Sequence, residues 1–365
     1  MSHPSESKGK IRSQPHASNH HSEKFRLGVE VEFLLIASNS RIPPNQISEF
    51  SKEVASSYND YLDRTGDCHP RMYNSIEEDH EDPTFSEWSL GIDKSINTMG
   101  VRACPLESTS PIFGIYEGSK WREDINFLWE FLTQNYQIPQ NDTCGTHIHL
   151  SRVEGYSLQE LKKIAQSVIH FEAAWEALLP EARRCNEYAK SNWVDNYKFA
   201  TKDLTREASL SRIQETRDIN ELVLLMHPYR DKRFGWNFVN LSPEPHSEAP
   251  YSTIEYRRGP SSTTAKDVFV SIEIAMSFIE AAIQQPNMEA IAKTPQTVGG
   301  LKMFIQAAHL PNKHGLYDSG YLKEFFANTR DDAFGLINPY EIKERAKHAE
   351  EINKELQFYH EEELE

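Results

Sequence analysis

The stretch Phe25-Arg-Leu-Gly-Val-Glu-Val-Glu-Phe-Leu-Leu-Ile36 predicts a β-strand with two acidic side chains on one face. Side chains alternate between the faces of a strand, so Glu30 and Glu32 point the same way, with their Cα atoms roughly 7 Å apart. Two carboxylates this close penalise each other's ionised form unless a cation lies between them. A solvated outer face is the alternative interpretation, and the apolar flanks of the stretch weaken it.

Two later stretches repeat this geometry with different side chains. His147 and His149 share one face of a predicted strand, and Thr253, Glu255 and Arg257 share one face of another. Either pattern alone is often structural, because histidine pairs occur in cores and acid-arginine runs occur on solvated surfaces. The three stretches together predict a site for a divalent metal and a phosphate group.

Composition sets limits on the partners of the chain. Its 365 residues include 39 Lys and Arg against 55 Asp and Glu, a net charge of −16. This balance argues against nucleic acid or an anionic membrane as the main partner, while a local basic pocket for ATP or a carboxylate stays compatible with it. The chain is long enough for a large core, and we expect small-molecule substrates.

No spacing typical of zinc sites joins the four cysteines, Cys68, Cys104, Cys144 and Cys185, and the polar stretch at 1–24 does not read as a secretory leader. We therefore expect reduced thiols and a cytoplasmic location. Cys144 lies close to the two histidines. We interpret it as a small buried thiol in preference to a nucleophile.

Apolar periodicity predicts an α+β fold with a mainly antiparallel, curved sheet. The predicted strands cover 25–36, 84–92, 101–108, 146–153, 236–241 and 252–258. The predicted helices cover 46–64, 119–135, one long helix through Leu158 and Trp175, and a helix that begins with a capping box at Thr264.

Three regions are expected along the chain. Residues 1–24 predict a disordered polar tail and residues 25–340 one large folded domain. Residues 341–365 predict a charged amphipathic helix, which either docks on its own domain or contacts a second subunit in a homo-oligomer.

Further runs accompany the three strands. They are Trp88-Ser-Leu-Gly-Ile-Asp-Lys-Ser95, Cys104-Pro-Leu-Glu-Ser-Thr-Ser-Pro111, Arg183-Arg-Cys-Asn-Glu-Tyr188 and Arg233-Phe-Gly-Trp-Asn237. In this order, with E-x-E, G-x-H-x-H-x-S and T-x-E-x-R, the chain resembles the glutamine synthetase superfamily of carboxylate-amine ligases. It is most similar to the amidoligase family within that superfamily, over roughly residues 25 to 285.

The resemblance implies a glutamine synthetase-like catalytic domain, with helices packed on the outer face of the sheet. It also implies an ATP-dependent ligase that forms an amide bond through an acyl phosphate, acting on an amino acid or another small carboxylate and an amine. Oxygen-rich ligands with a single imidazole favour Mg²⁺ or Mn²⁺ as the metal.

Site roles follow from the same resemblance. Glu30, His147 and Glu255 would hold one metal, and Glu32 would hold another with Glu107 as a further ligand. The nucleotide would face His149, Ser151 and Asn237, while Arg257 and Arg233 would act, with Glu255, on the substrate carboxylate or the transferring phosphate.

Two positions depart from the glutamine synthetase pattern, because Thr253 replaces an arginine and Asn141-Asp142 replaces an Asn-Gly turn.

Two other functions stay open. One is a metal-dependent amidohydrolase, which also uses an H-x-H pair but needs more histidines. Those available are His170, His227, His246 and His309, in no supporting pattern. The other is a non-catalytic protein that binds ATP or a partner.

Overall fold

The structure is a computed structural model, and it describes most of the chain. The described residues are 24–37, 46–76, 85–98, 103–180, 183–184, 186–200, 205–242, 252–310 and 317–333, with single positions at 344, 347, 348 and 351. The predicted tail at 1–24, apart from Lys24, and almost all of the predicted helix at 341–365 lie outside these residues.

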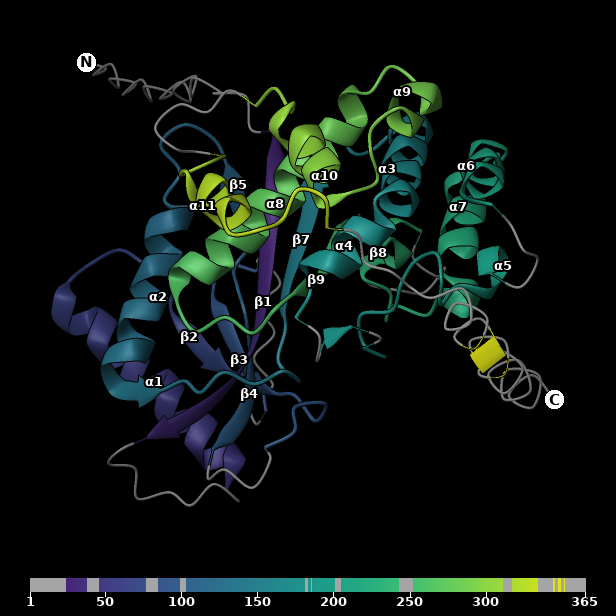
Figure 1. Ribbon diagram of the computed structural model, residues 1–365. Helices are drawn as coiled ribbons and strands as arrows, with labels where there is room; N and C mark the ends of the chain where they lie inside the picture. The colour runs from purple at the N-terminus through teal and green to yellow at the C-terminus, as the bar shows by residue number, and fades with distance from the viewer. Residues whose placement is uncertain are drawn as a thin grey trace, which may run out of the picture.

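The described strands form one nine-stranded sheet (Figure 1). Its strands are β1 Phe25–Ala37, β2 Met72–Asn74, β3 Trp88–Ile92, β4 Cys104–Thr109, β5 Phe113–Ile115, β6 Tyr136–Gln137, β7 Thr146–Arg152, β8 Trp236–Asn237 and β9 Ile254–Gly259. Their order is β2-β3-β4-β1-β7-β9-β8, with β5 and β6 also paired to β1. Every pair is antiparallel except β2 with β3, so the α+β class and the mainly antiparallel sheet are confirmed.

Eleven α-helices are described. They are α1 Ile47–Thr65, α2 Trp121–Asn135, α3 Leu158–His170, α4 Glu172–Leu178, α5 Tyr197–Ala200, α6 Arg206–Gln214, α7 Ile219–Met226, α8 Ala265–Gln284, α9 Met288–Ala292, α10 Val298–Gln306 and α11 Tyr321–Ala327. Short 3₁₀ helices cover Pro228–Arg230 and Val239–Leu241. Among the described residues, no helix is both long and apolar enough to cross a membrane.

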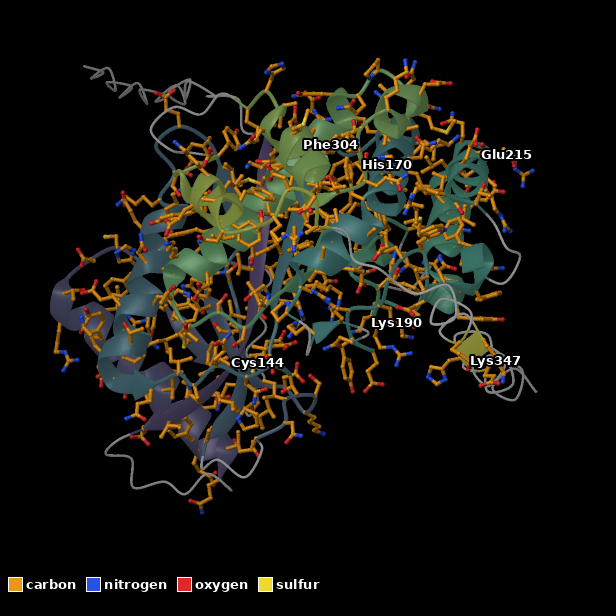
Figure 2. The ribbon with its side chains drawn as sticks, in the orientation of Figure 1. Cys144, His170, Lys190, Glu215, Phe304 and Lys347 are labelled. Carbon is orange, nitrogen blue, oxygen red and sulfur yellow. The ribbon has the colours of Figure 1, made fainter. Side chains whose placement is uncertain are left out.

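The apolar face of the sheet forms the core with the helices. Val29, Val31 and Phe33 on β1 are at most 2% exposed, as strand alternation predicts. Helix α1 packs on β2, β3 and β4. Helix α8 packs on β7, and α3, α10 and α11 pack against α8. His170 and Phe304, labelled in Figure 2, lie in this helical layer. The other face of β1 carries Glu30 and Glu32.

The N-terminus of α8 forms as the sequence predicts. Thr264 accepts a hydrogen bond from the backbone N–H of Asp267, and the Asp267 carboxylate accepts from the backbone N–H of Thr264. This capping box satisfies backbone donors that a helix start leaves open. Nearly all of α8 is buried, so its apolar stretch is a core helix.

The predicted long helix after β7 is wrong, because the chain divides it into α3 and α4 at Phe171. Phe171 has φ −94° and ψ 12°, which is outside helical geometry. Its ring is fully buried, with its centroid 4.8 Å from that of Phe304 on α10. Phe171, packed against α10 and α8, is thus the single residue that separates the two helices, which periodicity alone does not reveal.

The strand predicted at 236–241 is also wrong in length, because β8 ends at Asn237. The backbone N–H of Phe238 donates to His227 Nε2 at 2.9 Å, and Asn237 Oδ1 accepts from the backbone N–H of Val239 at 2.9 Å. The backbone N–H groups of Phe238 and Val239 are therefore not paired with a neighbouring strand, and the 3₁₀ helix follows. Strand β9 begins at Ile254, so Thr253 lies just before it.

Candidate metal and nucleotide site

The pairing of β1 with its two neighbours gathers acidic and imidazole groups on the polar face of the sheet. Directly opposed residues in antiparallel strands project to the same side. Glu30 lies opposite His147 on β7, and Glu32 lies opposite Glu107 on β4. Residues about 40 to 120 positions apart in the chain therefore meet at the middle of one sheet.

The pairing of β7 with β9 and β8 extends this face. His149 lies opposite Glu255, and Glu255 lies opposite Asn237. The β7–β9 register shifts between Thr146 and Ile148, which marks an irregularity beside His147.

His147 lies between two groups of carboxylates. Its Nδ1 is 3.3 Å from Glu30 Oε2 and 3.7 Å from Glu255 Oε1, while its Nε2 is 3.5 Å from Glu32 Oε1. Two sets of potential ligand atoms each lie within 4.8 Å of one another: Glu30 with His147 and Glu255, and Glu32 with Glu107 and His147. One ring nitrogen thus faces each set.

Charge is balanced on only one side of His147. Burial alone would raise the pKa of Glu30, but the charge of His149 and hydrogen bonds from both histidines hold it well below its usual value. Burial also acts to raise the pKa of Glu255, but the charges of His149 and Arg257 outweigh it and lower the pKa. Burial lowers the pKa of His149, but Glu30 and Glu255 raise it to about 9.

On the other side, the pKa values of the carboxyl groups are raised. Burial and the neighbouring Glu30 raise the pKa of Glu107 to about 7, and burial raises the pKa of Glu32. Glu32 is held in place by a 2.6 Å hydrogen bond from the backbone N–H of Gly145. Oxygen ligands that repel one another fit a divalent cation, which would remove the repulsion.

Arg257 lies at the Glu255 end of the site. Its NH1 group pairs with Glu255 Oε1, and its Nε donates to the backbone carbonyl of Tyr188 at 3.2 Å. Asn237 donates to Glu255 Oε2 at 2.7 Å. Glu255 is 3% exposed, so this pairing fixes its carboxylate among the other ligands. Asn237, expected at the nucleotide, contacts this carboxylate.

A cavity of about 190 Å³ adjoins the acidic groups. His149 and Ser151 line it from β7, and Gly28 and Glu30 line it from β1. Outside the strands, its lining includes Phe85, Ile112, Asn240 and Thr253. The cavity combines an apolar wall with a polar edge that faces the carboxylates.

Thr253 and Asn240 orient His149, a role that the sequence reasoning missed. His149 Nδ1 lies 3.3 Å from the Thr253 hydroxyl, which also accepts from the Asn240 side chain at 3.3 Å. The pattern Trp-Asn-Phe-Val-Asn in 236–240 offered the only signal for Asn240, as a second amide after Asn237.

Arg233 lies in a separate ion-pair group. Its Nε and NH2 bind the Asp231 carboxylate at 2.8 and 3.1 Å, and Lys190 binds the same carboxylate at 2.8 Å. The charges of Glu187 and Tyr188 also act on Arg233, after the dominant effect of Asp231, and together they raise its pKa. Arg233 therefore lies towards the Tyr188 loop that Arg257 contacts.

The 141–145 loop, near the label of Cys144 in Figure 2, closes the Glu32 side. Arg183 donates to the carbonyl of Cys144 and, at 3.0 Å, to that of Asp142. Burial, with the nearby Glu32 charge, raises the pKa of the Cys144 thiol to about 12, so the thiol stays protonated. Cys144 is fully buried, as the sequence predicts.

The further histidines considered for a hydrolase lie elsewhere. His170 Nε2 contacts the carbonyl of Thr294 at 2.8 Å, and His227 is held between backbone groups. His309 is exposed, and His246 is outside the described residues. None of the first three belongs to either ligand set found among the described residues.

Comparisons with known proteins place these observations in a family. Two solved structures are similar to the chain. A bifunctional glutathione synthetase from Pasteurella multocida is 12% identical with a TM-score of 0.34, covering 90% of this chain and 46% of that one. The complex between prokaryotic ubiquitin-like protein Pup and its ligase PafA is 11% identical with a TM-score of 0.31, covering 91% and 63%.

The chain thus spans less than two thirds of either protein. No curated protein matched it. Residues 23–279, well over half of the chain, match the family described as "Putative amidoligase enzyme". The chain belongs to this amidoligase family.

Proposed function

We propose that the protein is an ATP-dependent carboxylate-amine ligase that forms an amide bond through an acyl phosphate, with an amino acid or another small carboxylate as substrate. The observation that carries the proposal is the position of His147 between two carboxylate sets, beside a cavity lined by His149 and Ser151. Family membership supports the ligase class.

The two ligand sets fit Mg²⁺ or Mn²⁺. They offer carboxylate oxygens and one imidazole, the ligand types that these ions prefer, and burial and the Glu30 charge raise the pKa of Glu107 in the second set. Glu30, His147 and Glu255 would hold one ion, and Glu32 and Glu107 would hold a second. Divalent ions bound there supply charge neutralisation for phosphate oxygens.

In this proposal ATP occupies the cavity beside β1 and β7. Ser151 and His149 would bind its phosphates as hydrogen-bond donors, since a raised pKa keeps His149 cationic at neutral pH. Gly28 lies opposite His149 and has no side chain, so the phosphates could approach His149 closely. The apolar wall around Ile112 would contact the base.

Arg257 would bind the transferring phosphoryl group or the substrate carboxylate. A carboxylate oxygen attacks the γ-phosphorus and ADP leaves, which gives an acyl phosphate. The amine then attacks the acyl carbon and phosphate leaves with one oxygen of the original carboxylate. The guanidinium fork suits the charge that develops on these oxygens.

The proposal is tested in two steps. Mass spectrometry after incubation with ATP, Mg²⁺ and a pooled library of acids and amines should reveal a product equal to the two partners minus one water. With that pair, ¹⁸O placed in the carboxylate should appear in the released phosphate, and EDTA should stop turnover until Mg²⁺ or Mn²⁺ is added.

Three results would contradict the proposal. Label that stays wholly in the amide excludes an acyl phosphate. Hydrolysis restored by zinc without ATP favours the amidohydrolase function. Saturable ATP binding without any turnover across the library favours the non-catalytic function.

A further inference from the structure

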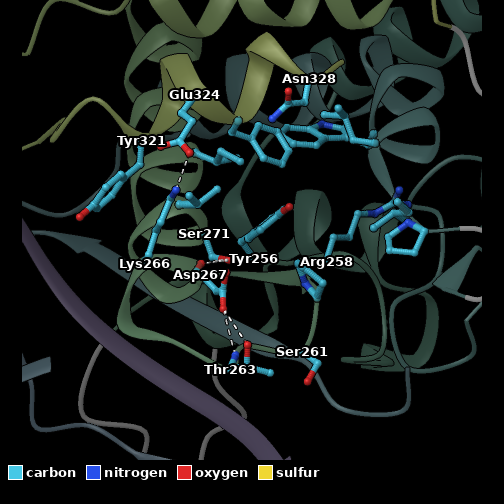
Figure 3. A pocket seen from close by; sticks show the side chains of 18 of the residues that line it. Tyr256, Arg258, Ser261, Thr263, Lys266, Asp267, Ser271, Tyr321, Glu324 and Asn328 are labelled. Carbon is cyan, nitrogen blue, oxygen red and sulfur yellow. Dashed lines mark hydrogen bonds and ion pairs between the residues drawn. The ribbon is translucent and has the colours of Figure 1, made fainter. Parts of the chain in front are cut away.

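A second cavity lies on the opposite side of β9 from the acidic groups (Figure 3). Its volume is about 410 Å³, within the usual range for small-molecule sites of about 300–1,000 Å³. Tyr256 and Arg258 line it and alternate along β9 with Glu255 and Arg257. Helices α4, α8 and α11 supply the other walls.

Tyr256 directs an unused hydroxyl group into this cavity. Its ring packs against Trp175 and Trp236, with centroids 5.7 and 4.9 Å away, and only 5% of the residue is exposed. Figure 3 shows the hydroxyl end projecting into the open space. Among the hydrogen bonds of the described residues, none involves this hydroxyl. The Ser261 hydroxyl in the same lining is buried and has no hydrogen-bond partner within the described part of the chain.

The buried Ser261 hydroxyl is costly to the fold unless a ligand or water satisfies it. A buried hydroxyl without a hydrogen bond loses its solvation and gains nothing in return. The neighbouring Trp175, Val270 and Phe325 make the surroundings largely apolar. The lining therefore suits a molecule with a flat apolar part and a few hydrogen-bonding groups.

The charged groups in the lining already have partners. Lys266 pairs with Glu324 at 2.6 Å, and Arg258 pairs with Glu172 and with Glu176. Asp267 accepts the capping hydrogen bonds at the start of α8. A ligand with a net charge would thus find no opposite charge to bind, and a neutral one loses less solvation on entry.

The cavity is linked to the candidate metal site through the turn after β9. Pro260 and Ser261 line the cavity, and the Pro260 carbonyl accepts from the Thr146 hydroxyl at 3.0 Å. Ser262 also contacts the Thr146 hydroxyl, at 2.6 Å. Thr146 directly precedes His147, at the irregularity in the β7–β9 pairing.

We propose that this cavity binds a neutral, amphipathic small molecule with an aromatic or similarly flat apolar part, and that its occupation steadies the 144–150 segment that carries His147. The hydroxyl of Tyr256 and the turn at Pro260 to Ser262 are the two contacts that make the site specific. Binding there is independent of ATP and metal, so it does not depend on the proposed ligase activity.

Binding is tested by calorimetry with three matched probes on the full chain: neutral N-acetylphenylalaninamide, anionic N-acetylphenylalanine and cationic phenylalaninamide. The neutral probe should bind at least about tenfold more tightly than the charged ones, a difference set by desolvation of charge. Val270→Phe, which fills the cavity from a half-buried position on α8, should abolish binding. Tyr256→Phe should weaken it about fivefold through loss of one hydrogen bond.

Tyr61→Phe removes a phenol hydroxyl on α1, away from the cavity, and should leave probe affinity unchanged. Equal binding of all three probes, no saturable binding, or full binding by Val270→Phe with an unchanged melting temperature would overturn the assignment.

The link to His147 is tested by hydrogen–deuterium exchange without metal or ATP. Saturating neutral probe should slow exchange in peptides that cover 144–150 at least about threefold in the wild-type chain and not in Val270→Phe. Unchanged exchange at confirmed saturation would overturn the link. Because neither measurement uses turnover, failure here is distinguishable from failure of the proposed ligase function.

Discussion

Glu32 and Glu107 lie directly opposite each other in the pairing of β1 with β4, and both belong to one set of potential ligand atoms within 4.8 Å. The pair lies away from the charge of His149, which stabilises the Glu30 side. Two carboxylates that face each other in the sheet therefore lack the compensation that their neighbours receive.

Glu107→Gln should stabilise the metal-free protein and weaken its binding of metal. The folded-state pKa of Glu107, about 7, is above the ordinary 4.5, so stability is lost as pH rises from 4.5 to about 7. Removing the charge should raise the free energy of unfolding at pH 8 by on the order of 2 kcal/mol. Urea unfolding in EDTA and Mn²⁺ titration by electron paramagnetic resonance measure the two effects.

Glu255→Gln is the matched control for that prediction. The pKa of Glu255 is lowered because His149 and Arg257 outweigh its burial, so its charge stabilises the fold. This variant should lose metal affinity and also lose stability in EDTA. Stabilisation by both variants, or by neither, would contradict the charge distribution described for the two sides of His147.

Gly145→Ala should damage the metal site without unfolding the protein. A Cβ atom at Gly145 would lie 3.0 Å from His147 Nε2 and 3.3 Å from Glu32 Oε2, where no side chain fits unless these groups move. We expect Mn²⁺ affinity to fall at least about tenfold, or about 1.4 kcal/mol.

Gly118→Ala provides the contrast. Gly118 has φ +90° and open space around its Cβ position, so the substitution strains the backbone alone. Its unfolding free energy should fall by about 1 kcal/mol or more, and its Mn²⁺ affinity should be unchanged. A loss of Mn²⁺ affinity in this variant would mean that reduced stability of the fold, and not a clash at the Gly145 Cβ position, explains the loss in Gly145→Ala.

Arg257→Lys should lower the turnover rate strongly. Lysine keeps the charge but loses the planar fork that contacts Glu255 and the Tyr188 carbonyl. By analogy with removal of an oxyanion donor, we expect a loss on the order of 3 kcal/mol in transition-state stabilisation, about a hundredfold in kcat. Initial rates of ADP formation with the identified substrates provide the measurement.

Arg233→Lys tests whether the two predicted catalytic arginines contribute equally to turnover. The Arg233 fork is already engaged by Asp231, so replacement should cost less than about tenfold in kcat. A hundredfold loss here, with little loss in Arg257→Lys, would exchange the roles of the two arginines.

His227 should make the protein acid-sensitive. Burial lowers its pKa to about 4, below the ordinary 6.5, so the unfolded chain takes up a proton first. Stability is fully present above pH 6.5 and falls as pH decreases towards 4, by up to about 3 kcal/mol for this group.

Urea unfolding between pH 7.5 and 4.5 checks this dependence. His227→Gln should be less stable at pH 7.5, because the hydrogen bonds with Phe238 and Asp231 are weakened, and its stability should vary less with pH. His309→Gln, at an exposed position, should keep the wild-type dependence. An unchanged slope in His227→Gln would assign the acid sensitivity to other groups.

The site could be predicted only in part from the chain. Strand alternation places Glu30 with Glu32 and His147 with His149, since this depends on neighbours two residues apart. The same local chemistry predicted the start of α8, where Thr264 and Asp267 satisfy each other's backbone donors. Alternation cannot tell which strands pair, so the meeting of Glu107 with Glu32 needed the sheet.

The sequence by itself determined which face of each strand carries acid, imidazole or guanidinium groups, and which face enters the core, because both follow from a two-residue period. Tertiary structure alone decided the register that places His147 between two carboxylate sets. It also ended β8 at Asn237 through the hydrogen bond from the backbone N–H of Phe238 to His227. These contacts join residues from different elements, and their geometry exists only once the helices and the sheet have packed together.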